Sequence, residues 1–411
     1  MPSPGQSTKR LRCRPRAIVA IMLVLVAGCT PSHTRSRATS SGASPAVGLA
    51  RFPEPGTGRL PSGQTAALQA VLDQVVAEYN QLRRHGFPAT HEAVPGITAA
   101  VVGNNGTWMG AAGRSGDSTP LTPHSMMAIG SITKTFTAAE VLHLAEVGKL
   151  NLDAQLSRYL PGRWTASRCT VRQALSMRSG LPADDAHADA LLLTLRHRHH
   201  HITPEQSART LVSDRPSRPG GAPAYSNAVF LLLGLLIEHV TQQPFAAAVR
   251  ADLIRPAGLD RIAVQDAERP VPPLAYPPER NGGHNDGYLP SQAGASVAFS
   301  AGGIAADAPT IARWGYQLYG ARVLSASTVQ SMIGQPTQSD VFPGVGYGLG
   351  TMIFHNLQFT INDSVGHGGG VPGYVSLLVV VPERHLSIAL LINDDGKDAF
   401  NIMGKLFLAL R

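Results

Sequence analysis

The sequence predicts an α/β protein of the α+β kind, in which one sheet is flanked by helices and a helical lobe is inserted into the chain between its strands. Strand-like segments lie near the start and near the end of the chain, and the middle has few strand candidates. This distribution indicates a single sheet assembled from sequence-distant pieces. With 411 residues, of which 43% are hydrophobic and 15% are charged, the chain can bury a large core in one or two domains.

The folded part is expected to open with an amphipathic helix over Gln64–Arg84, where apolar residues recur at helical spacing. Two short strands follow, over Gly96–Val102 and Gly106–Gly113, and the Gly-Asn-Asn connection between them suits a hairpin. A second helix is expected over Ser131–Glu146, ended by Gly148. The first part of the domain is therefore predicted to run helix, hairpin, helix.

Residues 150–290 predict an all-helical lobe with connecting loops, in which the long apolar run Ala228–Val240 forms a buried helix. Strands return over Tyr374–Val381 and Leu386–Asn393. The segment Ala399–Leu410 is expected to form a closing helix. The last strands would then join the first hairpin in one sheet.

The first 28 residues have the organisation of an export signal. A basic stretch precedes the apolar run at 17–28, which as a helix would span only about 18 Å, short of the roughly 30 Å hydrocarbon core of a bilayer. Residues 1–28 are therefore interpreted as a signal peptide. Its end, Leu25-Val26-Ala27-Gly28-Cys29, resembles the lipobox of bacterial lipoproteins. The resemblance implies that Cys29 becomes the acylated first residue; an ordinary secretory signal with an incidental cysteine is the alternative.

Residues 29–62 are rich in Ser, Thr, Pro, Gly and Arg, a composition that predicts a flexible tether ahead of a folded domain at residues 63–411. The expected location is the extracytoplasmic side of the cell membrane, with the membrane as a partner through the N-terminal lipid. Cys13 would leave with the signal and Cys29 would be lipidated, so Cys169 is expected to have no disulfide partner. A plain buried cysteine is expected there, with a reactive thiol as the alternative.

The charge distribution argues against nucleic acid as a partner. The formal net charge of +8 falls on residues 1–60, so residues 61–411 are neutral. Non-specific affinity for nucleic acid comes from neutralising phosphates, and a neutral domain offers no net field for this. No nucleic-acid binding is therefore expected.

A Ser-x-x-Lys motif opens the helix that follows Gly130. In Ser131-Ile132-Thr133-Lys134 the spacing brings the serine and the lysine onto neighbouring positions of one helical turn, where an amine can take the hydroxyl proton. The positive end of the helix dipole disfavours a cation there and would lower the lysine pKa, as a general base requires. The alternative is a capping serine beside a solvated lysine, because so short a motif also arises by chance.

Two further segments carry a possible chemistry. Tyr225-Ser226-Asn227 follows a Pro-Gly-Gly turn and precedes the apolar helix; taken alone, it indicates a core tyrosine beside a turn asparagine. The run Gly366-His367-Gly368-Gly369-Gly370 stands just before a strand. Glycines there let another backbone or a ligand approach closely and leave N–H groups to bind it, although a flexible turn is the simpler account.

Together, and in this order, the three motifs resemble the superfamily of serine β-lactamases, penicillin-binding proteins and serine esterases, in particular its class C-like branch. The resemblance covers about residues 65–411. It implies a β-lactamase/DD-peptidase-like fold, with an antiparallel sheet flanked by helices. Further segments that resemble the branch are Ser179-Gly180-Leu181-Pro182, Ala301-Gly302-Gly303-Ile304 with Asp307, and Gly346-Tyr347-Gly348-Leu349-Gly350.

The resemblance implies a role for each motif residue. Ser131 would be the acylated nucleophile, Lys134 its base and Tyr225 a second proton carrier; which of the two takes the first proton stays open. Asn227 would orient Lys134 and bind the substrate amide. The backbone N–H groups of Ser131 and Gly370 would form the oxyanion hole. The residues expected to bind substrate are Asn227, His367, Gly369 and Gly370.

Two departures from the family pattern stand out. Where many β-lactamases carry Lys-Thr-Gly, this chain has His367-Gly368-Gly369, which replaces a fixed cation with a group that is mostly neutral above its pKa of about 6.5. Recognition of a substrate carboxylate should therefore weaken. In addition, Met177-Arg178 precedes Ser179 where relatives often show His-Thr, and the sequence does not explain this difference.

The expected function is a serine hydrolase that acts through an acyl-enzyme on an ester or amide, as an esterase or a D-amino-acid peptidase, with a small-molecule or peptidoglycan-derived substrate and no cofactor. A monomer is expected. The alternatives are a catalytically silent envelope lipoprotein that binds peptidoglycan or a partner protein, and a true β-lactamase.

The His-rich run 197–201 could suggest a metal site, but no nearby Cys or acidic spacing completes a ligand set. A solvated loop is expected there, as it is for Asp184, Asp185 and His187, and no metal is expected.

Overall fold

The computed structural model describes residues 51–86, 94–160, 162, 164, 168–181, 194, 198–212, 218–278, 286–334, 336–338, 344–355 and 363–411. The chain divides into two units, and all of these residues belong to the second, Thr39–Arg411. The predicted signal peptide, Cys29 and most of the predicted tether lie outside the described residues, as do Asp184, Asp185 and His187.

An antiparallel sheet forms the base of the unit, and its described strands follow the spatial order β2-β1-β11-β10-β9-β8-β7-β6. The first and last strands of the described chain are neighbours near one edge of this sheet, because β1 pairs with β11 from Ile97 opposite Ile392 to Gly103 opposite Leu386. This is the sheet of sequence-distant pieces that the sequence predicts. The strands are β1 (Gly96–Gly103), β2 (Gly106–Gly113), β6 (Thr337–Gln338), β7 (Val345–Tyr347), β8 (Met352–Phe354), β9 (Ser364–Val371), β10 (Tyr374–Val381) and β11 (Leu386–Ile392).

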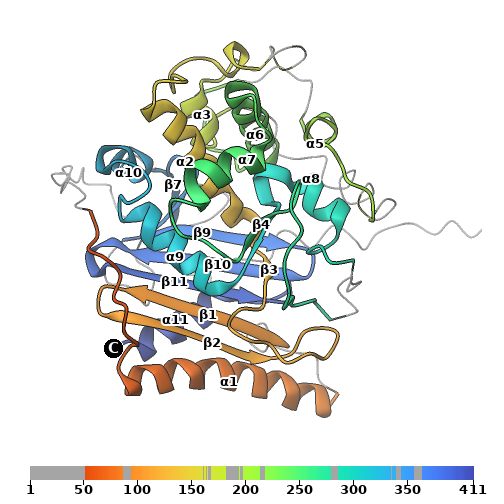
Figure 1. Ribbon diagram of the computed structural model, residues 1–411, viewed down its shortest axis with the longest axis vertical. Helices are drawn as coiled ribbons and strands as arrows, with labels where there is room; N and C mark the ends of the chain where they lie inside the picture. Colours follow the sequence, from red (N-terminus) through yellow and green to blue (C-terminus); the bar gives the residue numbers. More distant parts are fainter. Residues whose placement is uncertain are drawn as a thin grey trace, which may run out of the picture. The chain divides into compact units, whose positions relative to one another are not determined.

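Helices cover both faces of this sheet, as Figure 1 shows. The long helix α1 (Ser62–Arg84) and the closing helix α11 (Ala399–Ala409) pack together against one face. The helix α9 (Ala308–Tyr319) packs against β1, β10 and β11 from the other face. Because β1, β10 and β11 are covered on both sides, every residue in them is buried, which explains their continuous apolar sequences.

The helical lobe lies above the α9 face in Figure 1. Its central helix α6 is buried along most of its length, and Ser226 caps it by accepting a hydrogen bond from the Val229 N–H at 3.4 Å. No single described helix is long and apolar enough to cross a membrane; α6 and Phe245–Ile254 pass that test only as a pair bent by 77°. The helices are α2 (Thr133–Glu146), α3 (Val171–Leu175), α5 (Pro204–Leu211), α6 (Asn227–Thr241), α7 (Phe245–Val249), α8 (Gln292–Gly302) and α10 (Ala326–Ile333), with a π-helical turn η4 (Arg250–Ile254) and 3₁₀ turns η1 (Gly130–Ile132), η2 (Leu156–Arg158) and η6 (Pro382–Arg384).

The fold class predicted from the sequence is confirmed, but the lobe is not all-helical. A small sheet of order β3-β5-β4 lies beside it, and its strand β4 (Ile262–Val264) falls within the segment predicted to be helical. The other two strands are β3 (Met127–Ala128) and β5 (Ile304–Ala306). Strands of two or three residues are too short to show an alternating pattern, which is why the sequence did not reveal them.

The segment ahead of α1 is packed against the domain. Phe52 is buried between the rings of Tyr316 and His385, and its N–H donates to the carbonyl of Gly320 at 2.9 Å. The Leu60 N–H donates to Thr107 on the edge strand β2 at 3.0 Å. The prediction of a flexible tether reaching residue 62 is therefore wrong for residues 51–61, whose apolar side chains and backbone groups find partners on the domain.

Candidate active site

Ser131 lies in the 3₁₀ turn η1, directly ahead of α2, and the neighbouring Gly130 explains the shape of this turn. Gly130 has a φ of +49°, and a Cβ on it would lie only 2.7 Å from the backbone nitrogen of Gly370 on β9. A side chain is therefore excluded both by the backbone conformation and by the close approach of the strand. The turn is held from the other side as well, since the Ile129 N–H donates to the carbonyl of Ile304 at 3.0 Å.

Lys134 is fully buried, and its Nζ atom joins three elements. It lies 3.0 Å from the Ser131 hydroxyl oxygen, 2.7 Å from Oδ1 of Asn227 on α6, and 2.8 Å from the carbonyl oxygen of Ala301 on α8. Two of these partners can only accept a hydrogen bond, whereas a hydroxyl can also donate one. A neutral Lys134 can therefore keep both carbonyl contacts and receive the hydrogen bond of Ser131, which is the arrangement of a general base.

Tyr225 lies directly before α6 and is half-buried. Its ring centre is 5.0 Å from Nζ of Lys134, and it meets the ring of Tyr347 edge-on at 6.1 Å between centroids. The structure therefore brings the Ser131–Lys134 motif together with Tyr225 and Asn227, which lie far from it in sequence. These are the residues that the sequence assigns to the nucleophile and its proton carriers.

His367 is fully buried on β9, next to Tyr225 and Tyr347. Its Nδ1 lies 2.6 Å from the Gly368 carbonyl, which can only accept, so Nδ1 carries the proton. Its Nε2 then accepts a hydrogen bond from the Tyr347 hydroxyl at 3.1 Å. Burial, together with the charge of Lys134, lowers the pKa of His367 to about 3. The imidazole is therefore neutral, and the structure does not expose it for the direct substrate contact predicted from the sequence.

Tyr347 is neutral as well. Burial, reinforced by the neighbouring Tyr225 and Tyr319, raises its pKa well above the usual value. Tyr347 and Ala301 belong to segments that resemble the class C-like branch, but the sequence assigns neither of them a role. A buried tyrosine hydroxyl and a backbone carbonyl leave no pattern in a single sequence that reveals their partners.

The predicted oxyanion residues lie at the same corner of the domain. Gly370 pairs with Val375 on β10 but is exposed, and no heavy atom lies within 4 Å of the place where its Cβ would be. A Cβ on Gly369 would instead lie 2.1 Å from the Ile129 carbonyl. The glycines thus let β9 approach the turn of Ser131, and they leave space beside Gly370 for a ligand.

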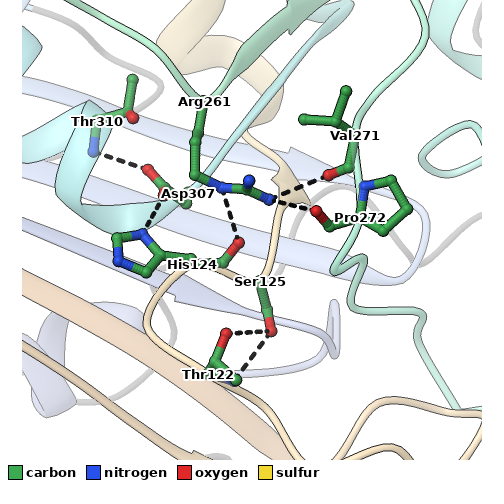
Figure 2. A network of polar contacts seen from close by, with 8 residues as sticks. All are labelled: Thr122, His124, Ser125, Arg261, Val271, Pro272, Asp307 and Thr310. Carbon is green, nitrogen blue, oxygen red and sulfur yellow. Dashed lines mark hydrogen bonds and ion pairs between the residues drawn. The ribbon is translucent and has the colours of Figure 1, made fainter.

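A buried aspartate, Asp307, lies at the centre of the polar network drawn in Figure 2. Asp307 caps α9 by accepting the Thr310 N–H at 2.9 Å, and its other oxygen lies 2.9 Å from Nδ1 of His124 and 3.4 Å from Nε of Arg261. It directly follows β5, whose residue Ile304 holds the Ser131 turn. Arg261 extends the network by donating to the carbonyls of His124, Val271 and Pro272.

Within the described residues, no group of three or more His, Cys, Asp or Glu side chains could hold a metal ion. Residues 198–201 of the His-rich run are described. His201 lies 2.7 Å from the Asp266 carbonyl, and His199 lies 3.5 Å from Asp286. Cys169 is buried.

Comparison with known proteins places this geometry in a family. The sequence model of the Beta-lactamase family matches residues 72–410. Protein flp of Staphylococcus aureus (strain N315) is 31% identical over 140 residues, which are 33% of this chain and 27% of the relative. The unguisins hydrolase ungD' of Aspergillus campestris is 25% identical over 336 residues, 73% of this chain and 58% of the relative. The chain therefore spans less than two thirds of the length of either relative.

Solved structures share the fold over nearly their whole length. A D-stereospecific amidohydrolase from Streptomyces sp. superimposes with a TM-score of 0.67 at 29% identity, over 84% of this chain and 98% of that one. The D-amino acid amidase from Ochrobactrum anthropi SV3 does so with a TM-score of 0.69 at 24% identity, over 85% and 99%. Since the family match spans most of the chain, this chain belongs to the Beta-lactamase family.

Proposed function

We propose that this chain is an amide hydrolase that forms an acyl-enzyme on Ser131 and prefers amides or short peptides of D-amino acids. The observation that carries the proposal is the placement of the Lys134 amine, 3.0 Å from the Ser131 hydroxyl and fixed by the carbonyl oxygens of Asn227 and Ala301. Of the three partners, only the hydroxyl can donate a proton as well as accept a hydrogen bond, so the amine is placed to take the Ser131 proton.

In the acylation step, Lys134 takes the Ser131 proton while the oxygen attacks the substrate carbonyl carbon. The charge that develops on the carbonyl oxygen is stabilised by the N–H groups of Ser131 and Gly370, and each such donor is worth about 3 to 4 kcal/mol in comparable sites. The C–N bond then breaks, and Tyr225 supplies the proton that the departing amine needs. In deacylation a water molecule attacks the ester carbonyl carbon and gives its proton to Tyr225. The bond to the Ser131 oxygen then breaks as that oxygen takes back the proton held by Lys134, which restores the hydroxyl.

The neutral His367–Tyr347 pair supports the choice of substrate. A β-lactam or a peptide with a free C-terminus presents a carboxylate beside the scissile bond, and the position where many β-lactamases hold a lysine carries here a buried, uncharged imidazole. The binding of an amide or ester substrate that lacks this carboxylate is not weakened by the absence of a positive charge at such a site. The similarity to an amidohydrolase that is itself D-stereospecific supports the same choice.

The test combines labelling with a substrate panel. A fluorophosphonate probe should label Ser131, and Ser131→Ala should abolish the label. The panel contains the D and L forms of phenylalanine amide, a D-Ala-D-Ala peptide, a p-nitrophenyl ester and a chromogenic β-lactam. We expect the highest kcat/KM for the D-amide and slow turnover of the β-lactam. No label on Ser131 rejects the hydrolase, and efficient β-lactam turnover rejects the assigned substrate class.

We further propose that the enzyme is lipid-anchored through Cys29 on the extracytoplasmic side of the membrane, on the strength of the short apolar run at 17–28 and the Leu25–Cys29 sequence. Cys29→Ser should leave the chain unprocessed or soluble. Unchanged partitioning of the variant into membranes would contradict the proposal.

A further inference from the structure

The departure from the family pattern at Met177-Arg178 has a structural counterpart at the end of helix α3. The Met177 N–H donates to the Ala174 carbonyl at 3.2 Å, and the Arg178 N–H donates to the Gln173 carbonyl at 2.8 Å. These two bonds form a Schellman motif, in which the residue after the C-cap takes a left-handed conformation and is usually glycine. Here that residue is Met177, with a φ of +58°. Met177 thus adopts a left-handed backbone conformation that side chains normally disfavour.

The Met177 side chain and backbone both contact the segment that carries Tyr225. The Ala224 N–H donates to the Met177 carbonyl at 2.9 Å, and the Ser226 N–H donates to the Met177 sulfur at 3.4 Å. The residues on either side of Tyr225 are therefore bound to one residue, and its sulfur supplies an acceptor that glycine could not. Met177 is only 2% exposed, so these contacts are made in the interior.

Arg178 holds the start of the same loop. Its guanidinium donates to the carbonyl of Gly220 at 2.7 Å and to that of Gly221 at 3.1 Å, and its own carbonyl accepts the Gly220 N–H at 3.0 Å. Two neighbouring carbonyls suit the fork of a guanidinium and not the single point of an ammonium group. The loop 220–226 is thus bound at both ends by the two residues that follow α3 and its C-cap.

We propose that Met177 and Arg178 are positioning residues that fix Tyr225 beside Lys134. This proposal rests on the proposed function, because its consequence concerns the proton transfers of Tyr225. Neither residue is placed to touch the reacting atoms. Loss of their contacts leaves the nucleophile and its lysine in place but lets the tyrosine move, so the chemical step slows while substrate affinity is kept.

Two substitutions of Met177 distinguish the hydrogen-bond acceptor that its sulfur provides from the volume that its side chain fills. Met177→Leu keeps an apolar side chain of similar size without an acceptor, and Met177→Gln offers an amide oxygen to the Ser226 N–H. We expect Met177→Leu to lower kcat for the p-nitrophenyl ester about tenfold with KM nearly unchanged, since small displacements of a catalytic group cost this much or more. Met177→Gln should recover most of the loss. The matched control is Met403→Leu, a buried methionine in α11, which should leave kcat unchanged.

Substitution of Arg178 tests the proposal independently of Met177. Arg178→Lys keeps the charge but loses the fork, and we expect kcat to fall several-fold. The control is Arg172→Lys in α3, whose guanidinium forms a comparable fork with Asp153, at 2.7 and 3.0 Å, instead of with the Tyr225 loop. Equal effects of the two Arg→Lys changes would indicate a general loss of stability and would overturn the role of Arg178.

Crystal structures of Met177→Leu and Met177→Gln decide the proposal even if no substrate is turned over. We expect the Tyr225 ring to be displaced in the first and restored in the second. An unmoved Tyr225 in Met177→Leu, or equal kcat for Met177→Leu and the wild type, overturns the proposal. Absence of fluorophosphonate labelling in the wild type instead rejects the hydrolase, so the two failures are distinguishable.

Discussion

The hydroxyl of Tyr347 donates a hydrogen bond to Nε2 of His367, and this contact lies wholly in the interior of the domain. Two neutral side chains, His367 on β9 and Tyr347 on β7, are thus paired beside Tyr225. The pair explains how a histidine can stand beside Lys134 without repelling it, because the imidazole takes no second proton in the folded state.

His367 should make stability fall on acidification. Its pKa is about 3 in the folded chain and 6.5 when exposed, so between these values the unfolded chain holds a proton that the folded chain does not. The free energy of unfolding should therefore decrease as the pH falls below about 6.5, by up to about 1.4 kcal/mol per pH unit. Urea unfolding of wild type and His367→Gln between pH 3.5 and 7 measures this. A slope that is unchanged in the variant would contradict it.

Glu140 should make the free energy of unfolding decrease as the pH rises. It is fully buried on α2, and burial with the neighbouring Asp252 carboxyl raises its pKa to about 8, against a smaller effect of Lys149. The folded chain then holds a proton that the unfolded chain has lost between pH 4.5 and 8, so stability should fall as the pH rises through this window. Unfolding of Glu140→Gln from pH 5 to 9 should show a flatter profile. An equally steep profile for Glu140→Gln and the wild type would contradict this prediction.

Asp307 should be among the costliest positions to change. Asp307→Ala removes the α9 cap and leaves the Arg261 guanidinium without its carboxylate, and we expect a loss of about 3 to 5 kcal/mol. Asp153→Ala, which breaks an exposed ion pair with Arg172, should cost under about 1 kcal/mol. Chemical denaturation of both variants tests the difference, and similar losses would refute the special role of the buried aspartate.

Gly130→Ala should impair both folding and catalysis. The left-handed backbone at Gly130 and the nearby nitrogen of Gly370 both oppose a side chain, so the turn must shift away from β9. Gly148→Ala is the matched control, because Gly148 has a φ of +75° but open space around its Cβ position. We expect about 1 kcal/mol of destabilisation and normal activity for the control. For Gly130→Ala we expect kcat to fall at least a hundredfold. Equal activities would show that the contact with β9 is unimportant.

How far the sequence predicts the structure depends on the length of each pattern. The helix predicted at 64–84, the hairpin and the strand at 374–381 agree with the structure within two residues, since each extends over several periods of its pattern. Strands as short as β4 and β6 have no period to detect. Conversely, 51–61 has a tether-like composition, yet Phe52 and a few backbone hydrogen bonds attach it to the domain.

The candidate active site also contains residues whose role the sequence predicts and contacts that it does not. Motif residues such as Ser131, Lys134 and Asn227 could be assigned from the sequence, and the structure brings them within hydrogen-bonding distance. The partners of His367 could not, because a hydrogen bond to Tyr347 depends on how β7 and β9 are placed in the sheet. A histidine in a glycine-rich strand indicates a ligand contact as readily as a buried pair.

The attachment of residues 51–60 bears on how a soluble form of the enzyme is prepared. The stretch donates from Leu60 to the Thr107 carbonyl and accepts from the Thr107 N–H at Gly58, so it shields the outermost strand β2. A truncation that starts at α1 would uncover those backbone groups and offer them to a second molecule, which invites aggregation. A chain that begins at Arg51 would lack the proposed lipid anchor and still keep this edge closed.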